Sequence, residues 1–429
     1  MGDRDGARGG RTRRPRRGGA PRVGRAPRGA RGAAEVALPC DRANPPQPCA
    51  RRRRDRNRFA RTAAVRASRG AARRGGAPVT DPSIRSIGTA TPEERLTRDA
   101  WLAFADAIAP PEASRALLAR LAERSAIDSR GAAAATEPPF YAGRDAPGTA
   151  ARMRLWSQAA RAMAERACRA ALAHGEAEPA TITHVVTASC TGFESPGVDA
   201  HLIERLGLPR AVARVNIGFM GCHAAVNALG VARALAATDP SARVLVCCAE
   251  VCSAHFHHDA RIDRLIANTL FGDGAAAAIV DGTARSRAHA PRLAATHSLL
   301  LAGTEDEMAW TIGDHGFEMT LGARVPDILR GEVGAWAATA LATHGLRVDE
   351  IGAWAIHPGG PRVIESVLES LGLAASAGDA SRAILRDHGN MSSATLLFIL
   401  ERLMREDAPR PWVGLAFGPG LVGEMLLVR

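Results

Sequence analysis

The amino-acid sequence predicts an α/β fold in which helices cover both faces of buried sheets, and three observations carry this prediction. Residues 182–188, 243–248 and 275–280 are short, nearly continuous apolar runs. Stretches with helical patterning alternate with these runs. Strands that read as unbroken apolar runs are typical of sheets buried on both faces. The region from residue 81 to residue 429 is also long enough to bury a large core.

A cysteine lies at a predicted junction between a strand and a helix. Val215–Phe219 alternates apolar residues with polar or small ones, which places the odd-numbered side chains of a strand on one face. Glycines mark a sharp turn, and residues 224–237, rich in Ala and Leu and free of proline, predict a helix. Cys222 would face unpaired N–H groups at the helix start, which can lower a thiol pKa from about 8.5 into a range of about 3.5–7.5. The alternative for this residue alone is a buried structural cysteine.

Two later loops carry a histidine and an asparagine. His357 follows the apolar stretch 351–356 and precedes Pro-Gly-Gly, which places the imidazole at the carboxyl end of a predicted strand. Asn390 follows a glycine and precedes a predicted helix at 392–405. Judged separately, such a histidine is more often a core or surface residue, and Gly-Asn is usually a turn. With Cys222, however, the two residues complete the groups that acyl transfer between thioesters requires.

Five motifs in register resemble the type III polyketide synthases, the chalcone-synthase-like branch of the thiolase-fold condensing enzymes. The resemblance covers about Val79 to Arg429, and subgroup features resemble bacterial members that make alkylpyrones or alkylresorcinols. The residues that carry it are Gly221-Cys222, Leu270-Phe271-Gly272-Asp273-Gly274-Ala275, His357-Pro358-Gly359-Gly360, Gly389-Asn390-Met391-Ser392-Ser393 and Phe417-Gly418-Pro419-Gly420.

The resemblance implies a thiolase-like fold, in which two similar αβαβα halves form a five-layered core. The N-terminal half would span residues 79–285 and carry the nucleophilic cysteine. The C-terminal half would span residues 286–429 and carry His357 and Asn390. No repeat is visible at the level of the sequence itself.

The resemblance also implies the reaction. Cys222 would take the acyl group of a coenzyme A thioester, and His357 would stabilise the thiolate. His357 and Asn390 would then hold the thioester oxygen of malonyl-CoA while carbon dioxide leaves, and the resulting enolate would attack the acyl-enzyme. Repeated extension and cyclisation would give an alkylpyrone, an alkylresorcinol or a related phenolic. The alternative is a single-extension condensing enzyme of the β-ketoacyl synthase III type.

Further site residues follow from the resemblance alone. Phe271 matches an aromatic gatekeeper, and Met319 replaces a second one, which would widen the choice of starter because methionine is flexible. Arg120 and Arg124 match basic residues that contact the phosphates of coenzyme A, although a solvated helix face is the alternative. The expected substrate-cavity residues are Cys190, Thr191, Cys252, His255, Trp310 and Ser392.

Neither a metal nor a redox cofactor is expected, and coenzyme A thioesters serve as substrates. The segment with Cys252, His255 and His257 lacks a second ligand pair at a recognised metal-site spacing. A homodimer is implied, with Ser195 at the place of a residue that reaches across the dimer. The adjacent Cys247 and Cys248 are poor geometry for a disulfide framework, so a reducing cytoplasm is expected. No apolar run is long enough to predict a membrane span.

The first 78 residues are a different material, rich in Arg, Gly and Pro, and are predicted to be disordered. Residues 1–80 carry a net charge of +18, whereas the whole chain carries +12, so the remainder carries −6 (12 minus 18). The tail can bind nucleic acid or an anionic surface non-specifically. With the single aromatic Phe59 it is a poor base-stacking surface. A mis-assigned start of translation is an alternative account of the tail.

Overall fold

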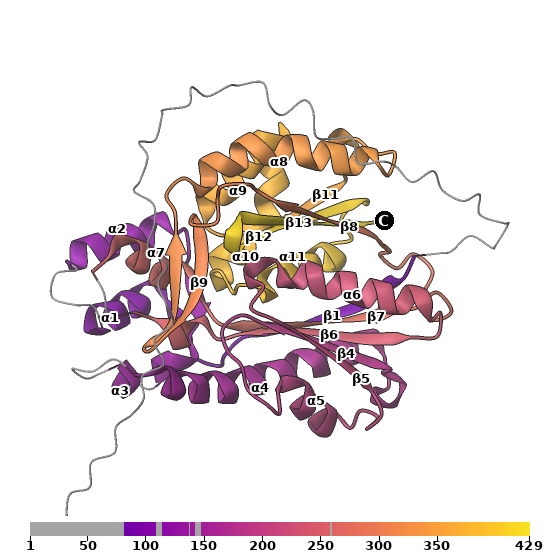
Figure 1. Cartoon of the computed structure of the whole chain (residues 1–429), viewed down its shortest axis with the longest axis horizontal. Helices are drawn as coiled ribbons and strands as arrows, with labels where there is room; N and C mark the ends of the chain where they lie inside the picture. Colours follow the sequence, from indigo (N-terminus) through magenta and orange to yellow (C-terminus); the bar gives the residue numbers. More distant parts are fainter. Residues whose placement is uncertain (1–80, 109–113, 137, 142–146, 258–259) are drawn as a thin grey trace, which may run out of the picture. The chain divides into compact units, whose positions relative to one another are not determined.

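A computed structural model describes residues 81–429, apart from 109–113, 137, 142–146 and 258–259. Within this part of the chain, two sheets alternate with three layers of helices (Figure 1). Three clusters of buried apolar side chains fill the spaces between the layers. The predicted α/β class and the five-layered, thiolase-like arrangement are therefore confirmed. The tail predicted at residues 1–78 lies outside the described residues.

The first sheet has five strands in the order β1-β7-β6-β4-β5. Strands β4, β5 and β6 run parallel, and β7 is antiparallel to both of its neighbours. All residues of β6 and β7 are buried, because helices cover both faces of the sheet, and this explains their unbroken apolar sequences. The strands are β1 (Ser83–Ala90), β4 (His184–Ser189), β5 (Ala213–Gly218), β6 (Arg243–Glu250) and β7 (Gly274–Asp281).

The second sheet repeats most of this pairing pattern in the C-terminal half. Its order is β11-β12-β13-β8, with β11 and β12 parallel and the other two pairs antiparallel. Read from β8, it matches the sequence of pairings from β1 to β4 in the first sheet. The strands are β8 (Leu293–Leu300), β11 (Ala353–Ile356), β12 (Trp412–Gly418) and β13 (Val422–Val428).

Helices occupy the outer and middle layers. The long α4 (Thr149–Gly175) and α5 (Val198–Leu206) cover the outer face of the first sheet, and α8 (Val325–Ala342) and α9 (Pro361–Leu371) cover the second (Figure 1). Helices α6 (Ala224–Thr238) and α11 (Ala394–Arg405) pack between the sheets, and α10 (Asp379–His388) packs against α11. Both middle helices were predicted, since α6 begins at Ala224 and α11 ends at Arg405.

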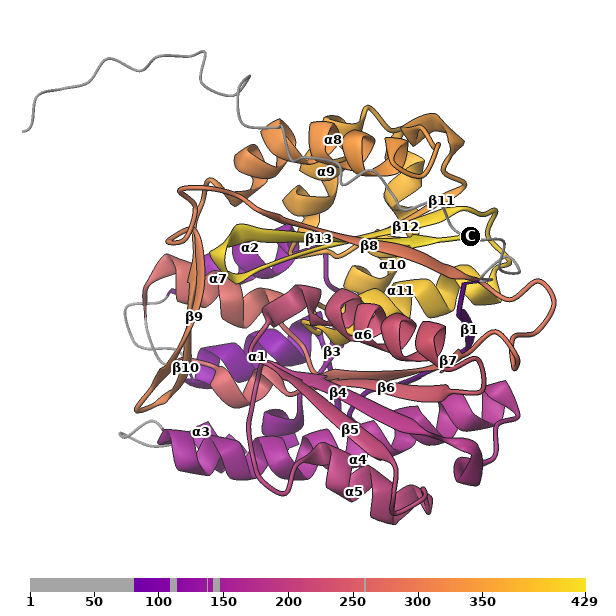
Figure 2. The ribbon, with the colours of Figure 1, turned by 45° about the vertical axis from the view of Figure 1, so that its right-hand side comes forward.

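Shorter elements lie at one end of the layers (Figure 2). The hairpin of β9 (Met308–Gly313) and β10 (Gly316–Leu321) stands apart from both sheets (Figure 2). Near it lie α1 (Arg98–Ile108), α2 (Arg115–Arg124) and α7 (Ile262–Leu270) (Figure 2). A small sheet pairs β2 (Arg95–Thr97) with β3 (Ser129–Gly131), and α3 (Pro138–Tyr141) is a single turn.

The strand before Cys222 differs from its prediction in one respect. Strand β5 is the edge of the first sheet, and most of its residues are exposed rather than buried on one face. Phe219 lies beyond the strand in the left-handed region, with a φ of 61°. The alternation therefore predicted a strand correctly, but it did not predict that the apolar side chains of this strand would be exposed.

Candidate active site

A tight turn between β5 and α6 presents Cys222. Gly221 has a φ of 76°, and a Cβ on it would lie 2.3 Å from Cδ of Pro419. Glycine is therefore required both for the backbone conformation and for the close approach of the Phe417–Gly420 segment. Cys222 is 6% exposed and follows directly in a 3₁₀ turn that leads into α6. The sharp turn predicted from the glycines is present, and residues of the C-terminal half hold it in place.

The side chain of Asn390 is oriented by the turn that follows it. Its Oδ1 accepts a hydrogen bond from the backbone N–H of Ser392 at 2.9 Å. With the oxygen occupied in this way, the amide nitrogen is the group left to donate toward Cys222. The Asn390 backbone is fixed as well, because its N–H donates to the carbonyl of Leu270 at 2.9 Å and its carbonyl accepts from Gly272 N–H at 3.0 Å.

His357 stands at the end of β11 with its ring uncommitted. Its backbone N–H donates to the carbonyl of Leu415 at 2.7 Å, which extends the pairing of β11 with β12 by one residue. The side chain is buried, and neither ring nitrogen has a hydrogen-bond partner among the described residues. A buried imidazole with both nitrogens free is positioned to bond a ligand or a second catalytic group.

Burial controls the protonation of the thiol and the imidazole. Burial raises the pKa of the Cys222 thiol to about 12, although hydrogen bonds from Ser392 and Asn390 act in the opposite direction. Burial also lowers the pKa of His357 to about 3. The expectation that the helix start would lower the pKa of Cys222 is therefore wrong, because desolvation outweighs the effect of the helix start. A thiolate here requires a matching imidazolium, so the two groups would titrate as a pair.

Two cavities meet at Cys222. We call the larger and more open one the outer cavity and the other the inner cavity. The outer cavity has a volume of about 280 Å³, and both His357 and Asn390 line it. The inner cavity has a volume of about 40 Å³ and contains all six residues that were predicted to line the substrate cavity. Four residues line both cavities and so form the boundary between them: Cys222, Phe271, Met308 and Met319. The structure thus places the two predicted gatekeepers beside the thiol.

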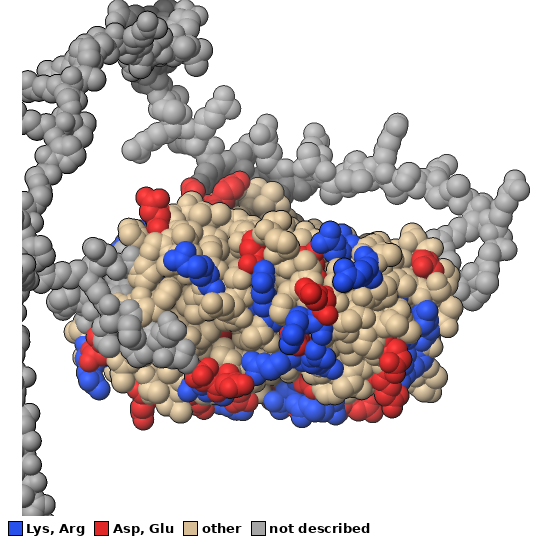
Figure 3. Space-filling model, turned by 90° about the horizontal axis from the view of Figure 1, so that it is seen from below, with Lys and Arg blue, Asp and Glu red and all other residues tan. Residues whose placement is uncertain are grey.

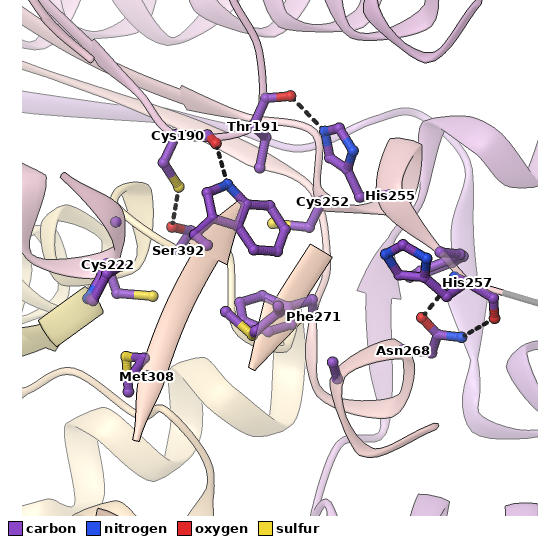
Figure 4. A pocket seen from close by; sticks show the side chains of 16 residues that line it. Cys190, Thr191, Cys222, Cys252, His255, His257, Asn268, Phe271, Met308 and Ser392 are labelled. Atoms are coloured by element: carbon purple, nitrogen blue, oxygen red, sulfur yellow. Dashed lines mark hydrogen bonds between the residues drawn. The ribbon is translucent and has the colours of Figure 1, made fainter. Parts of the chain in front are cut away.

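Hydrogen bonds tie the wall of the inner cavity together (Figure 4). The indole N–H of Trp310 donates to the carbonyl of Cys190 at 2.6 Å, and the sulfur of Cys190 lies 3.0 Å from the hydroxyl of Ser392. Nε2 of His255 donates to the carbonyl of Thr191 at 2.6 Å, and its Nδ1 accepts from the backbone N–H of Phe317. Since burial also lowers the pKa of His255 to about 3, this ring is a neutral part of the wall.

Sequence reasoning missed a buried carboxylate behind this wall. Glu250 is fully buried and accepts hydrogen bonds from the hydroxyl of Thr191 at 2.6 Å, from the hydroxyl of Ser393 and from the backbone N–H groups of Cys190 and Thr191. Burial raises the pKa of its carboxyl group. The signal was a single acid at the end of the apolar β6, and its bonds join the loop after β4 to the start of α11.

Basic residues at the outer cavity correspond only in part to the prediction. Arg124, exposed near the end of α2, lines the outer cavity. Arg120 is also exposed, but it lines neither cavity. Arg362 at the start of α9 lines the outer cavity and was not predicted. Its position two residues after the His-Pro-Gly-Gly motif was the signal that sequence reasoning did not use.

The histidines near the inner cavity form hydrogen bonds with the backbone. Nε2 of His257 lies 2.9 Å from the carbonyl oxygen of Phe317, and the bonds of His255 are described above. In the part of the chain that the structure describes, no group of three or more His, Cys, Asp or Glu side chains is arranged to hold a metal ion. Over the same residues, no helix has the length and apolar character needed to cross a membrane.

The sequence is similar to known proteins over most of its length. Residues 68–284 match the N-terminal domain of chalcone and stilbene synthases, and residues 292–429 match the C-terminal domain. A 1,3,6,8-tetrahydroxynaphthalene synthase from Streptomyces peucetius subsp. caesius is 36% identical, over 81% of this chain and 93% of that protein. An alpha-pyrone synthesis polyketide synthase-like protein from Mycobacterium tuberculosis is 33% identical, over 82% of this chain and 91% of that protein.

Solved structures are similar as well. PKS-I from the brown alga Ectocarpus siliculosus superposes with a TM-score of 0.76 at 29% identity, covering 82% of this chain and 98% of that chain. The type III polyketide synthase domain of Steely1 from Dictyostelium superposes with a TM-score of 0.75 at 26% identity, covering 81% of this chain and 99% of that one.

Proposed function

The chain belongs to the chalcone and stilbene synthase family and is a type III polyketide synthase, and on this premise we propose how its residues divide the work. The protein is an acyltransferase whose condensation step is driven by loss of carbon dioxide. The observation that carries the proposal is the position of Cys222 where two cavities meet, with His357 and Asn390 on the outer one. The single-extension alternative is not favoured, because the similar proteins are polyketide synthases.

The first half-reaction loads the starter. The Cys222 thiol passes its proton to His357, and the thiolate attacks the carbonyl carbon of an acyl-CoA bound in the outer cavity. The carbon–sulfur bond to coenzyme A breaks, and the departing thiolate takes the proton back from the imidazolium. Pairing the two charges supports this step, because either charge alone is opposed by burial.

The second half-reaction extends the chain. The thioester oxygen of malonyl-CoA accepts hydrogen bonds from the free amide nitrogen of Asn390 and from His357. Carbon dioxide leaves, and these two donors hold the enolate oxygen while its carbon attacks the acyl group on Cys222. The Cys222–carbonyl bond breaks, and the departing thiolate takes up a proton from water by way of His357, which restores the neutral thiol and imidazole for another loading step. Apolar Phe271 and Met319 at the junction disfavour the malonyl carboxylate and so favour its loss.

The substrates and the product class belong to the same proposal. Coenzyme A thioesters are the substrates, and Arg124 and Arg362, which line the outer cavity, would pair with their phosphates. We assign an alkylpyrone, alkylresorcinol or related phenolic product, in keeping with the names of the similar proteins. The free, buried cysteines of the described region support a reducing cytoplasm.

The experiment that tests the proposal is incubation of the purified protein with malonyl-CoA and a panel of acyl-CoA starters, followed by mass analysis of products. Products with two or more malonyl-derived units support iterative synthesis. Cys222→Ala is expected to abolish the acyl-enzyme. Asn390→Ala is expected to lower malonyl-CoA decarboxylation by at least about 100-fold, as for loss of one oxyanion donor, while loading changes far less. Equal loss of both half-reactions would contradict the role of Asn390.

A homodimer is proposed at the open edge of the first sheet. Phe193, Val215 and Met220 are exposed at 42%, 37% and 40%, and they cluster at β5 and the loop that contains Ser195. Exposed apolar side chains on an unpaired strand edge favour pairing with a second copy. Val215→Arg is expected to give monomers in analytical ultracentrifugation, while Ile312→Arg, at a more exposed position on β9, leaves the dimer intact. A wild-type monomer at micromolar concentration would refute the dimer.

A further inference from the structure

Arg130 on β3 is a buried cation that the reaction described above does not use. Its side chain is 1% exposed, and no acidic residue pairs with it among the residues that the structure describes. Its Nε has no hydrogen-bond partner in the same region, and burial lowers the pKa of the guanidinium to about 9. Burial of an unpaired charge costs free energy, so hydrogen bonds to this guanidinium must offset that cost.

The guanidinium binds the carboxyl end of α7. Its Nη1 donates to the carbonyl of Thr269 and, at 3.3 Å, to the carbonyl of Phe271. These carbonyls belong to the last turn of α7 and to its cap, where no helical N–H is available and a positive charge is favourable. The ring of Trp101 lies under the guanidinium, 5.1 Å from its carbon.

The carbonyl between these two is hydrogen-bonded to Asn390. The carbonyl of Leu270, between the two that Arg130 binds, accepts the backbone N–H of Asn390 at 2.9 Å. The backbone of Asn390 returns a bond by accepting the N–H of Gly272 at 3.0 Å. The gatekeeper Phe271 therefore lies on a segment held from one side by Arg130 and from the other by Asn390.

Two glycines pack beside Arg130, one required by close packing and the other by its backbone conformation. A Cβ on Gly272 would lie 3.1 Å from Cβ of Arg130 and 2.7 Å from the carbonyl oxygen of His388. Gly389 has a φ of 71°, and a Cβ there would lie 3.5 Å from Cβ of Arg130 and 3.2 Å from the carbonyl oxygen of Leu270. Small shifts of Arg130 are thus passed to both loops.

We propose that Arg130 is a positioning residue for the condensation, which fixes Phe271 and Asn390 relative to each other by capping α7. It touches no substrate and acts through these two residues. The inference rests on the proposed function, because it concerns the step in which Asn390 holds the enolate oxygen. Cys222 lies on a different element, the turn before α6, so loss of the cap is expected to change its acylation less than it changes decarboxylation.

The test is Arg130→Lys, which keeps a positive charge but loses the planar guanidinium. Decarboxylation of malonyl-CoA and acylation of Cys222 are measured separately. The first is followed by the acetyl-CoA that forms, and the second by the increase in protein mass. A displacement of the Asn390 amide by about 1 Å costs about 100-fold. We expect decarboxylation to fall by about 10- to 100-fold, with loading within about threefold of wild type.

Matched variants separate positioning from general destabilisation. Arg243→Lys alters another buried arginine, at the start of β6, where it pairs with Asp281. It is expected to lower the melting temperature without changing the ratio of the two half-reactions. Trp101→Leu removes the ring beneath the guanidinium and is expected to shift the ratio in the same direction as Arg130→Lys, but less. This second variant serves if Arg130→Lys fails to fold.

Two outcomes overturn the inference and leave the proposed function standing. Both require that Asn390→Ala retains its selective loss of decarboxylation. In the first, Arg130→Lys or Trp101→Leu leaves the ratio of half-reactions unchanged. In the second, Arg130→Lys reduces loading and decarboxylation equally. If Asn390→Ala itself shows no selective loss, the role of Asn390 fails instead.

Discussion

At the scale of single residues, the central question is how a fully buried thiol becomes a nucleophile. Burial raises the pKa of Cys222 to about 12 and lowers that of His357 to about 3, so both side chains are neutral at pH 7. Transfer of one proton creates an ion pair in which each charge offsets the desolvation of the other. Reactivity at Cys222 should therefore depend on His357 before any substrate is bound.

Alkylation of Cys222 in His357→Gln tests this dependence. Glutamine cannot accept the thiol proton, so the thiolate becomes a lone buried charge. We expect the rate of inactivation by iodoacetamide at pH 7 to fall by at least about tenfold, and the remaining rate to rise with pH across the accessible range. Asn390→Ala is the comparison: it leaves the imidazole in place and removes one hydrogen bond that lowers the pKa of the thiol, so its rate should fall less than that of His357→Gln. An unchanged rate in His357→Gln would separate thiol activation from the imidazole.

Residue identities at the site followed largely from sequence motifs, whereas their electrostatics did not. The motifs were sufficient to single out Cys222, His357 and Asn390, which the structure brings to one cavity. The pKa of Cys222 depends on burial by distant segments, so a helix start seen in sequence gave the wrong direction. Arg130 carries no motif that marks it, because its contacts are backbone carbonyls far along the chain.

At the scale of elements, the β9–β10 hairpin limits the inner cavity. Trp310 and Met319 are directly opposite each other in the register of the hairpin, and both line the cavity. The indole also fastens the hairpin to Cys190 through a hydrogen bond at 2.6 Å. One element thus supplies a wall of the inner cavity and part of the boundary beside Cys222.

Trp310→Gly tests how this hairpin sets product size. Loss of the indole enlarges a cavity of about 40 Å³ and removes the bond to Cys190. We expect larger products, with one or more additional malonyl-derived units or a longer starter, and a lower melting temperature. Ile312→Ala, at an exposed position of the same strand, should change neither. Products of unchanged mass from the Trp310 variant would show that another wall sets the limit.

Element boundaries were predicted best where burial is complete. The apolar runs at 243–248 and 275–280 became the central strands β6 and β7, each extended by one or two residues. The pattern could not reveal that β7 runs antiparallel to β6, because a strand buried on both faces has no directional signature. The hairpin was also missed, since it borders a cavity and faces solvent and so lacks a clean alternation.

At the scale of the whole molecule, charge is distributed differently in the enzyme and in the first 80 residues. Residues 81–429 are net acidic, because removing the +18 of residues 1–80 from the total of +12 leaves −6. The face over α4 and α5 mixes both signs (Figure 3), with ion pairs such as Arg161–Glu194 and Arg169–Glu165. Mixed charge of this kind gives no continuous basic surface there for a nucleic acid.

Buried neutral histidines are expected to make the protein sensitive to acid. Burial lowers the pKa of His255 and His357 to about 3 and that of His388 to about 4, whereas unfolded imidazoles titrate near about 6.5. Below that pH the unfolded chain binds protons that the folded chain does not, so the free energy of unfolding falls as pH falls. Asp273 opposes this between about pH 6 and 4, because burial raises its pKa to about 6.

Denaturant unfolding of His255→Gln at several pH values checks this expectation. Between about pH 5.5 and 4 the free energy of unfolding should fall less steeply than in wild type, by up to about 1.4 kcal/mol per pH unit, since one proton fewer is linked to unfolding. His289→Gln alters an exposed histidine and should keep the wild-type slope. Parallel curves for His255→Gln and wild type would mean that this ring is not neutral in the folded protein.

The contact between Gly221 and Pro419 has a consequence for engineering by recombination. The turn that holds the nucleophile closes against a segment almost two hundred positions later, so neither half carries a finished reaction centre. Hybrid enzymes that join the N-terminal half of one synthase to the C-terminal half of another must keep this contact between the glycine and the proline. Without it, hybrids with a crossover between the two sheets should fold but have low turnover. Taking residues 417–420 from the synthase that supplies the turn at Gly221 should restore activity.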